Sequence, residues 1–199
     1  RGNIVDWFPQ APKWVDEAHI AYLRRNERGG VLGIAQASLN GPADAMLVVD
    51  TVWPYDGFAL TPDGNRLAYA RSEEGPLVVM DLRSGERIAV EGGASQSVRS
   101  PSERLQWSPD GVYLAGKAGL AGVFLVEGDP PAYRVSQLKV FGLLGEGQSW
   151  APDRRRLVIL IERQAGQRPS LAIYDLETAS LHPLAVEVSP PYAMAWNPK

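Results

Sequence analysis

A short turn motif recurs along the chain at a nearly constant interval, and this repeat constrains the fold more than any other feature of the sequence. Each copy has an apolar residue, a small or polar residue and then proline, and two copies continue with Asp-Gly. The copies are Leu60-Thr-Pro-Asp-Gly64, Trp107-Ser-Pro-Asp-Gly111, Trp150-Ala-Pro-Asp-Arg154 and Trp196-Asn-Pro-Lys199. Their prolines are spaced by 47, 43 and 46 residues. A fixed period of this length indicates a repeat architecture in which each copy forms one structural unit.

A degraded copy of the pattern lies further upstream. Trp14-Val-Asp-Glu17 precedes Ile20-Ala-Tyr22 as Leu60-Thr-Pro-Asp63 precedes Leu67-Ala-Tyr69, with one residue fewer between the two parts. Residues 12–29 also fit an amphipathic helix, because apolar residues there are spaced by four. The agreement with the later copies favours strands over the helix.

Each period contains four short apolar stretches separated by turn residues. In the second period these are Phe58–Leu60, Leu67–Ala70, Leu77–Leu82 and Arg87–Val90. Proline followed by Asp-Gly reverses the chain, since proline fixes φ, Asp supplies an acceptor and Gly tolerates positive φ. A second turn, Asp81-Leu-Arg-Ser-Gly85, recurs as Asp175-Leu-Glu-Thr-Ala179. Four short strands in about 45 residues predict one blade of a β-propeller.

The predicted fold is therefore all-β: a β-propeller of four-stranded antiparallel blades, with four recognisable blades and the start of a fifth, as part of a larger propeller. A compact four-bladed ring is the alternative, which the odd strand count disfavours. The predicted segments are 1–10 as a candidate outer strand of a closing blade, 11–54, 55–103, 104–146 and 147–191 as blades, and 192–199 as the first strand of a further blade.

These motifs resemble a known family. The apolar-Ser/Thr-Pro-Asp-Gly turn, the Leu-Ala-Tyr-type strand after it and the Asp-Leu-x-Ser/Thr-Gly turn are similar to the WD40-like propeller repeats of TolB, the periplasmic component of the Tol-Pal system. Similar repeats occur in the propeller domains of prolyl oligopeptidases and dipeptidyl peptidases. The resemblance covers roughly residues 11–199, departs from the pattern at Val126-Glu-Gly-Asp-Pro-Pro131, and implies a bacterial protein of the periplasm or cell exterior.

Composition excludes several classes of protein. The 199 residues are 45% hydrophobic and carry a net charge of −3, which is typical of a globular protein and argues against a nucleic-acid partner. No apolar run approaches the roughly 18 residues of a membrane span. The absence of cysteine excludes disulfides and thiolate ligands. The chain begins with Arg1 rather than Met, which suggests a processed or excised chain.

Catalytic and metal-binding patterns are weak in this sequence. His19 and His182 are the two histidines, and no Gly-x-Ser-x-Gly motif is present, so we expect no catalytic residues, no metal and no cofactor. The turn aspartates Asp63, Asp110 and Asp153 stand singly, which favours turn formation over calcium binding. The glycines of the segment 116–122 indicate a flexible connection between two strands.

Tryptophans and arginines provide the candidate binding residues. Trp14, Trp107, Trp150 and Trp196 share one repeat position and are predicted to pack between neighbouring blades. Trp53 and Tyr55 lie in a predicted connection between blades, where exposed aromatic residues anchor partners. The predicted loops between second and third strands carry a basic rim that would steer an acidic partner. Its members are Arg24, Arg25, Arg28, Arg71, Lys117, Arg163 and Arg168.

The sequence predicts a non-catalytic binding or scaffold module that contacts another protein or another domain of its own chain. The alternative is the gating propeller of a larger serine peptidase similar to prolyl oligopeptidase. A weaker alternative is a sensor that binds a small ligand in the channel.

Overall fold

Four antiparallel sheets account for all of the regular structure that is described. The computed structural model describes residues 12–25, 31–41, 45–48, 58–70, 76–90, 105–118, 122–128, 130, 132–138, 148–161 and 170–187. These residues form sixteen strands and contain no helix. Within each sheet the strands lie side by side in chain order. In the segment 12–29, residues 13–14 and 19–25 are strands, so the prediction of strands is confirmed and the helical alternative is wrong for the described residues 12–25.

The strands of the four sheets are as follows. Blade 1 has β1 (Lys13–Trp14), β2 (His19–Arg25), β3 (Val31–Ser38) and β4 (Ala45–Val48). Blade 2 has β5 (Phe58–Leu60), β6 (Arg66–Ala70), β7 (Leu77–Asp81) and β8 (Arg87–Ala89). Blade 3 has β9 (Gln106–Trp107), β10 (Tyr113–Ala118), β11 (Gly122–Glu127) and β12 (Arg134–Leu138). Blade 4 has β13 (Gln148–Trp150), β14 (Arg156–Ile161), β15 (Ser170–Asp175) and β16 (Ser180–Glu187).

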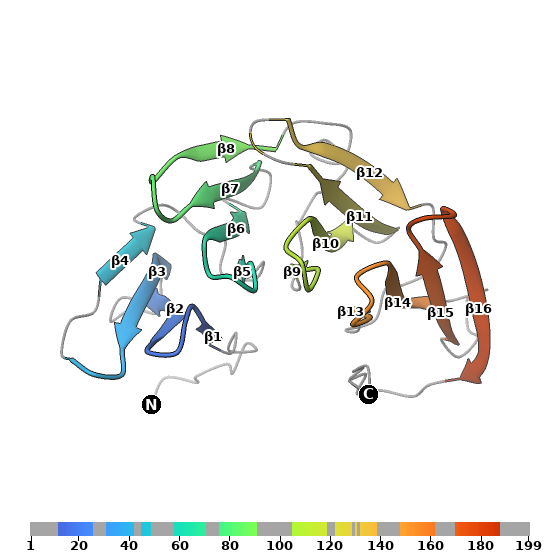
Figure 1. The fold of residues 1–199 in the computed structure, drawn as a ribbon, viewed down its shortest axis with the longest axis horizontal. Helices are drawn as coiled ribbons and strands as arrows, with labels where there is room; N and C mark the ends of the chain where they lie inside the picture. Colours follow the sequence, from blue (N-terminus) through green and yellow to red (C-terminus); the bar gives the residue numbers. More distant parts are fainter. Residues whose placement is uncertain are drawn as a thin grey trace, which may run out of the picture.

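The blades follow one another around an open arc (Figure 1). The first strand of each blade lies on the inner side of the arc and the fourth strand on its outer side. Innermost strands of consecutive blades contact each other, as β1 does with β5 and β5 with β9. This is the arrangement of propeller blades, and it confirms the predicted fold class.

The hydrophobic core lies between the blades rather than within them. Each of three buried clusters takes residues from two consecutive blades. The first joins Ala21, Ile34 and Val48 of blade 1 to Phe58, Leu67, Tyr69, Val78 and Met80 of blade 2. The second joins Ala59, Ala68, Leu77, Val79 and Val90 of blade 2 to Leu105, Trp107, Leu114, Phe124 and Val126 of blade 3. The third joins Ala115, Val123, Leu125 and Leu138 of blade 3 to Trp150, Leu157, Ile159, Ile161 and Ala172 of blade 4.

Alternation along the strands explains this distribution, because successive side chains point to opposite faces of a sheet. Leu114 of β10 faces blade 2, whereas the next residue, Ala115, faces blade 4. Every central blade is therefore apolar on both faces, which accounts for the nearly continuous apolar runs in the second strands.

Two glycines of the predicted loop lie in strands, Gly116 in β10 and Gly122 in β11. Gly116 belongs to β10 and pairs with Phe124 of β11. A Cβ atom at this position would come within 2.3 Å of the Phe124 ring. Gly116 thus provides the space for an aromatic side chain on the adjacent strand. The prediction of a flexible connection is wrong at both Gly116 and Gly122.

In the described part of the chain no helix is long and apolar enough to cross a membrane. The predicted segments 1–10 and 192–199 lie outside the described residues.

Candidate interaction surface at the turn end

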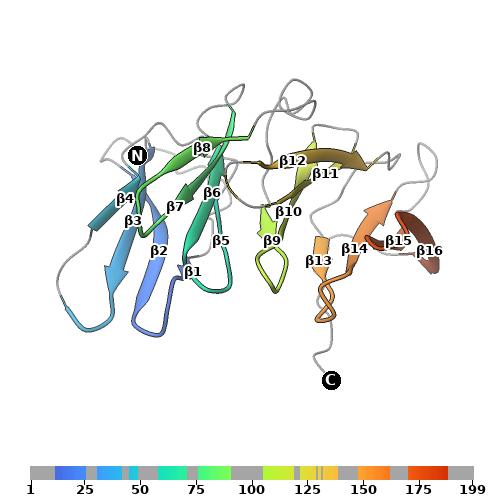
Figure 2. The ribbon, with the colours of Figure 1, turned by 45° about the horizontal axis from the view of Figure 1, so that its top comes forward.

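The topology brings two turns of a blade to the same end of the molecule. In an antiparallel sheet the turn between the first and second strands and the turn between the third and fourth strands lie at one end. Figure 2 shows these turns together at one end of the blades. We call the resulting surface the turn end. It comprises residues 15–18, 61–65, 108–112 and 151–155 from the first turns and 38–41, 82–86 and 176–179 from the second turns.

The first turn is closed in the same way in all four blades by one aspartate. Its carboxylate accepts a hydrogen bond from the backbone N–H two residues later, as in an Asx turn. The pairs are Asp16 with Ala18 at 2.8 Å, and Asp63 with Asn65, Asp110 with Val112 and Asp153 with Arg155, each at 3.1 Å. Blade 1 keeps this bond although it lacks the Pro-Asp-Gly sequence. The prediction that Asp63, Asp110 and Asp153 form turns is confirmed.

A hydroxyl at the start of the turn adds a second set of bonds. Ser108 Oγ donates to Asp110 Oδ1 at 2.6 Å and accepts from the N–H of Tyr113 at 2.9 Å. Thr61 makes the equivalent contacts with Asp63 and Arg66 in blade 2. Both hydroxyl-bearing residues are buried. The turns are therefore held by side chains as well as by their backbone bonds.

Hydrogen bonding keeps these carboxyl groups ionised. Partial burial would by itself raise the pKa of Asp110, but the Ser108 hydroxyl and the Val112 N–H outweigh it, and the pKa lies below its ordinary value. The pKa of Asp63 is lowered by the same balance, in which contacts with Thr61 and Asn65 overcome burial. The turn end consequently presents fixed negative charges at neutral pH.

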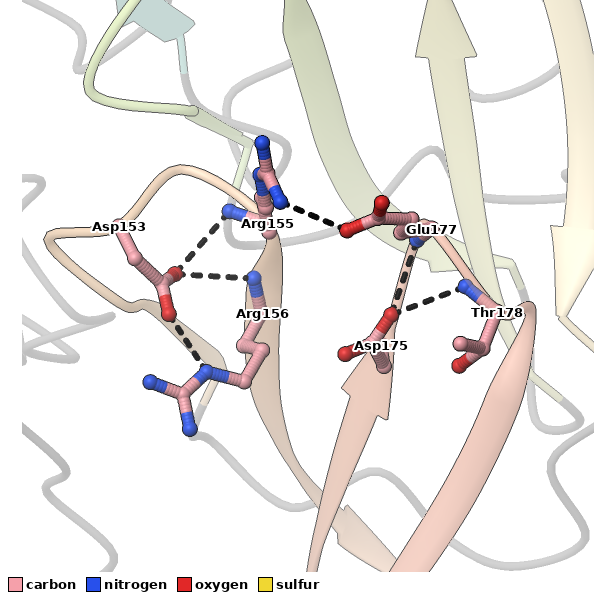
Figure 3. Close-up of polar contacts among 6 residues, drawn as sticks. All are labelled: Asp153, Arg155, Arg156, Asp175, Glu177 and Thr178. Atoms are coloured by element: carbon pink, nitrogen blue, oxygen red, sulfur yellow. Dashed lines mark hydrogen bonds and ion pairs between the residues drawn. The ribbon is translucent and has the colours of Figure 1, made fainter.

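The second turn repeats this chemistry with a different aspartate. Asp175 accepts from the N–H groups of Glu177 and Thr178 at 2.9 and 3.0 Å, and the bond from Thr178 is the main reason that its pKa is lowered (Figure 3). Asp81 accepts from the N–H groups of Arg83 and Ser84 at 2.9 and 2.7 Å. Its pKa is lowered chiefly by the bond from Ser84.

The two turns of a blade are also joined to each other. A backbone N–H at the second turn donates to a carbonyl at the first turn in blades 1, 2 and 4. These bonds are Leu39 to Ala18 at 2.8 Å, Leu82 to Asn65 at 2.8 Å and Leu176 to Arg155 at 2.9 Å. In blade 4 an ion pair at 2.7 Å between Arg155 and Glu177 spans the same two turns (Figure 3). The turn end is therefore a preformed surface.

The recurrent tryptophans connect one blade to the blade before it. The indole N–H of Trp107 donates to the carbonyl of Ala59 at 3.3 Å, and that of Trp150 donates to the carbonyl of Gln106 at 3.1 Å. Both side chains are 5% exposed, which confirms the predicted packing between blades. Trp14 departs from the prediction, because it is 63% exposed. The physical reason is that the described residues include no blade that precedes blade 1.

Solved structures of other proteins are similar to this arrangement of blades. TolB from Acinetobacter baumannii is 17% identical with a TM-score of 0.59, and the match covers 87% of this chain and 42% of that chain. The fold is a TolB-like β-propeller. A prolyl endopeptidase matches with 14% identity and a TM-score of 0.60 over 90% of this chain and 29% of that chain.

The β-propeller domain of the Trilobed protease from Pyrococcus furiosus is also similar, with 16% identity and a TM-score of 0.57. That match covers 90% of this chain and 57% of that domain. No protein-family model and no curated protein matches the sequence. This chain thus spans 42% of the TolB structure, 29% of the prolyl endopeptidase and 57% of the protease propeller domain.

Most of the predicted binding residues of the TolB-like propeller lie outside the described part. Arg24 is exposed near the end of β2, with its guanidinium 4.0 Å from the sulfur of Met46. Arg25 is the last residue of β2. Both arginines therefore belong to a strand and not to the predicted loop. The other members of the proposed site, Arg28, Trp53, Tyr55, Arg71, Arg163 and Arg168, lie outside the described residues.

Both histidines of the TolB-like propeller contact neighbours in their own blades. His19 Nδ1 lies 2.8 Å from the carboxylate of Asp16, which reinforces the first turn of blade 1. His182 Nε2 lies 2.8 Å from Ser180 Oγ, a pair on the exposed outer strand β16 that the sequence analysis missed. Ser180 and His182 are two residues apart, which places both side chains on one face of a strand, and this spacing is the sequence signal for the contact. Within the described ranges no group of three His, Cys, Asp or Glu residues is placed to hold a metal ion.

Proposed function

We propose that this propeller is a non-catalytic binding module that holds another protein, or another domain of its own chain, against its turn end. The observation that carries this proposal is the repeated joining of first and second turns by backbone hydrogen bonds. A surface fixed in this way loses little conformational entropy on binding, so more of the contact energy contributes to affinity.

The charges of the turn end suit a polar partner of mixed charge. Besides the ionised turn aspartates, the turn end carries Arg83, Arg154 and Arg155. Arg155 is paired with Glu177 across the two turns of blade 4. Charged surfaces of this kind favour specificity and fast association. We propose an extracytoplasmic, bacterial setting for this role, in line with the TolB-like repeats, and no nucleic-acid partner.

Site-specific photo-crosslinking tests the proposal in cells that express the natural gene. A benzophenone amino acid would replace Glu17 or Arg83 at the turn end, with Arg24 at the opposite end of β2 and Val186 on β16 as controls. All four residues are exposed. We expect one partner to be captured from Glu17 and Arg83 only. Capture of a partner from position 24 instead would indicate that the partner binds at the predicted basic rim. Absence of capture from all four positions would contradict the binding role.

A gating propeller of a larger serine peptidase is the second candidate, and similarity to a prolyl endopeptidase and to a protease propeller domain favours it. A fluorophosphonate probe discriminates the two candidates when it is applied to the protein expressed from its natural gene. Labelling of the product would support the peptidase. Absence of labelling, together with turn-end crosslinks, would support the binding module.

A further inference from the structure

The first turn of blade 4 carries an arginine where the first turns of blades 2 and 3 have glycine. Arg154 has a φ of 67°, close to the 70° of Gly64 and the 73° of Gly111. This left-handed backbone conformation is unstrained for glycine and unfavourable for a residue with a side chain. Blade 4 therefore keeps a strained residue at a position where the repeat offers an unstrained one.

The two arginines that follow Arg154 are paired with carboxylates, whereas Arg154 is not. Arg155 forms an ion pair with Glu177 at 2.7 Å, and Arg156 forms one with Asp153 at 2.5 Å. Arg154 is exposed, and among the described residues its guanidinium has no hydrogen-bond or ion-pair partner. Its N–H donors are therefore available to a ligand.

The guanidinium of Arg154 lies at the junction between the first turns of blades 3 and 4. Burial raises the pKa of the Asp110 carboxyl in blade 3, hydrogen bonds lower it, and the nearby positive charge of Arg154 lowers it further. The same carboxylate accepts the N–H of Val112 at 3.1 Å. Val112 is 44% exposed, whereas its turn position holds Asn65 in blade 2 and Arg155 in blade 4. The junction thus combines an unpaired cation with an exposed aliphatic side chain.

Both departures from the repeat work against the stability of the isolated propeller. Arg154 strains the backbone, and Val112 leaves apolar surface in water. Backbone strain of this kind is found where a residue serves a ligand. A guanidinium pairs with a carboxylate through two parallel hydrogen bonds. The nearby charge of Asp110 repels a phosphate dianion more strongly than a carboxylate, so the junction favours the carboxylate.

We propose that Arg154 and Val112 form a recognition site for an acidic segment of the partner protein. An Asp or Glu side chain of that segment pairs with Arg154, and an adjacent aliphatic side chain packs on Val112. This inference rests on the proposed function, which places a partner against the turn end, and it specifies the chemistry of that partner.

Photo-crosslinking from position 17, in blade 1, measures the contribution of each residue in the natural gene product. Arg154→Gly restores the residue of the repeat, so the Tm should stay unchanged or rise while the yield of crosslinked partner falls about tenfold. Val112→Asn introduces the residue of blade 2 and should lower the yield about threefold. Arg134→Gln is the control. It removes one positive charge from the exposed outer strand β12 and should change the yield by less than about twofold.

A charge exchange then tests the pairing with Arg154. A benzophenone amino acid at position 112 and mass spectrometry identify the partner segment, which should contain an Asp or Glu next to an aliphatic residue. Arg154→Glu should abolish the crosslink from position 17, and arginine in place of that acidic partner residue should restore it. Restoration would support direct pairing, and its absence would overturn it.

The remaining outcomes separate this inference from the proposed function. An unchanged yield with Arg154→Gly would overturn the recognition site and leave binding at the turn end in place. An equal loss with Arg134→Gln would overturn it as well, because net charge would then account for the effect. A crosslink from position 112 to nucleic acid or lipid would contradict an acidic protein segment. Absence of capture from the natural sequence at positions 17 and 83 would overturn both proposals.

Discussion

The effect of an individual residue on the stability of this propeller depends mainly on its contacts with the preceding blade. Gly64 has a φ of 70°, and a Cβ atom there would lie 2.1 Å from the carbonyl oxygen of Val15 in blade 1. Gly85 has a φ of 76°, but no atom lies within 4 Å of its Cβ position. The two glycines share a backbone conformation and differ in whether a neighbouring blade is close.

Replacing each glycine by alanine separates the cost of the left-handed backbone conformation from the cost of the contact with the neighbouring blade. Gly85→Ala should reduce the free energy of unfolding by about 1 kcal/mol, the cost of a left-handed alanine. Gly64→Ala should cost about 1–3 kcal/mol more, because the new methyl group displaces the backbone of blade 1. Urea denaturation of the two variants measures both values. Equal losses would show that blades 1 and 2 are not in contact at this turn.

Tryptophan substitutions at one repeat position should have unequal consequences. Trp107→Ala and Trp150→Ala should each cost about 3–5 kcal/mol of unfolding free energy, since both rings are buried between blades. Trp14→Ala in the 199-residue chain should change it by about 0.5 kcal/mol or less, as for other exposed residues. Chemical denaturation checks all three, and a large loss for Trp14→Ala would mean that its ring is covered in solution.

Among the structural elements, the turns make the free energy of unfolding depend on pH. The carboxyl groups of Asp63 and Asp110 have a pKa below the value of 3.8 expected in the unfolded chain. Their ionised forms therefore stabilise the fold above pH 3.8, and this contribution is lost as the pH falls through the lower folded-state pKa.

Asp110→Asn should flatten the acid part of the stability profile, because the amide does not titrate in this range. Unfolding midpoints in urea from pH 7 to pH 3 would show it, with Glu127→Gln, an exposed position on β11, as the control. A profile identical to the natural one would contradict a role for Asp110 ionisation in stability.

On the face that packs on the preceding blade, the larger side chain of a cross-strand pair lies on different strands in blades 2 and 3. Blade 2 has Tyr69 opposite Val78, whereas blade 3 has Gly116 opposite Phe124. Gly116→Ala should therefore cost about 1–3 kcal/mol by overpacking, and the additional change Phe124→Leu should restore part of the loss. Denaturation of the single and double variants completes the cycle. Strict additivity would indicate that the two positions do not share one space.

The strands and turns could be predicted from sequence because they recur in every period. The exposure of Trp14 could not, since the repeat specifies the face of a blade and not whether a neighbour covers it. The sequence predicts a loop at Gly116, because the need for its small size arises across the sheet, at Phe124. The joining of the turns at the turn end leaves no signal in the sequence, because the bonds are between backbone atoms.

The whole molecule is an array in which buried clusters join consecutive blades. Stability in such arrays is set by each unit and its contacts with its neighbours. Blade 1 has a described neighbour on one face, whereas blades 2 and 3 have one on each. In the 199-residue chain we expect the amides of residues 20–24 to exchange hydrogen faster than those of residues 67–70 and 114–116. Mass spectrometry of deuterium uptake measures this order, and equal protection would indicate that the array unfolds as a single unit.

The indole hydrogen bonds have a direction along the chain. In both described cases the acceptor lies in the earlier blade, Ala59 for Trp107 and Gln106 for Trp150. During synthesis, each of these acceptors leaves the ribosome before its donor, at translation rates of about 5–20 residues per second. Each of these two blades, once made, finds its docking surface already present, so that order of assembly follows order of translation.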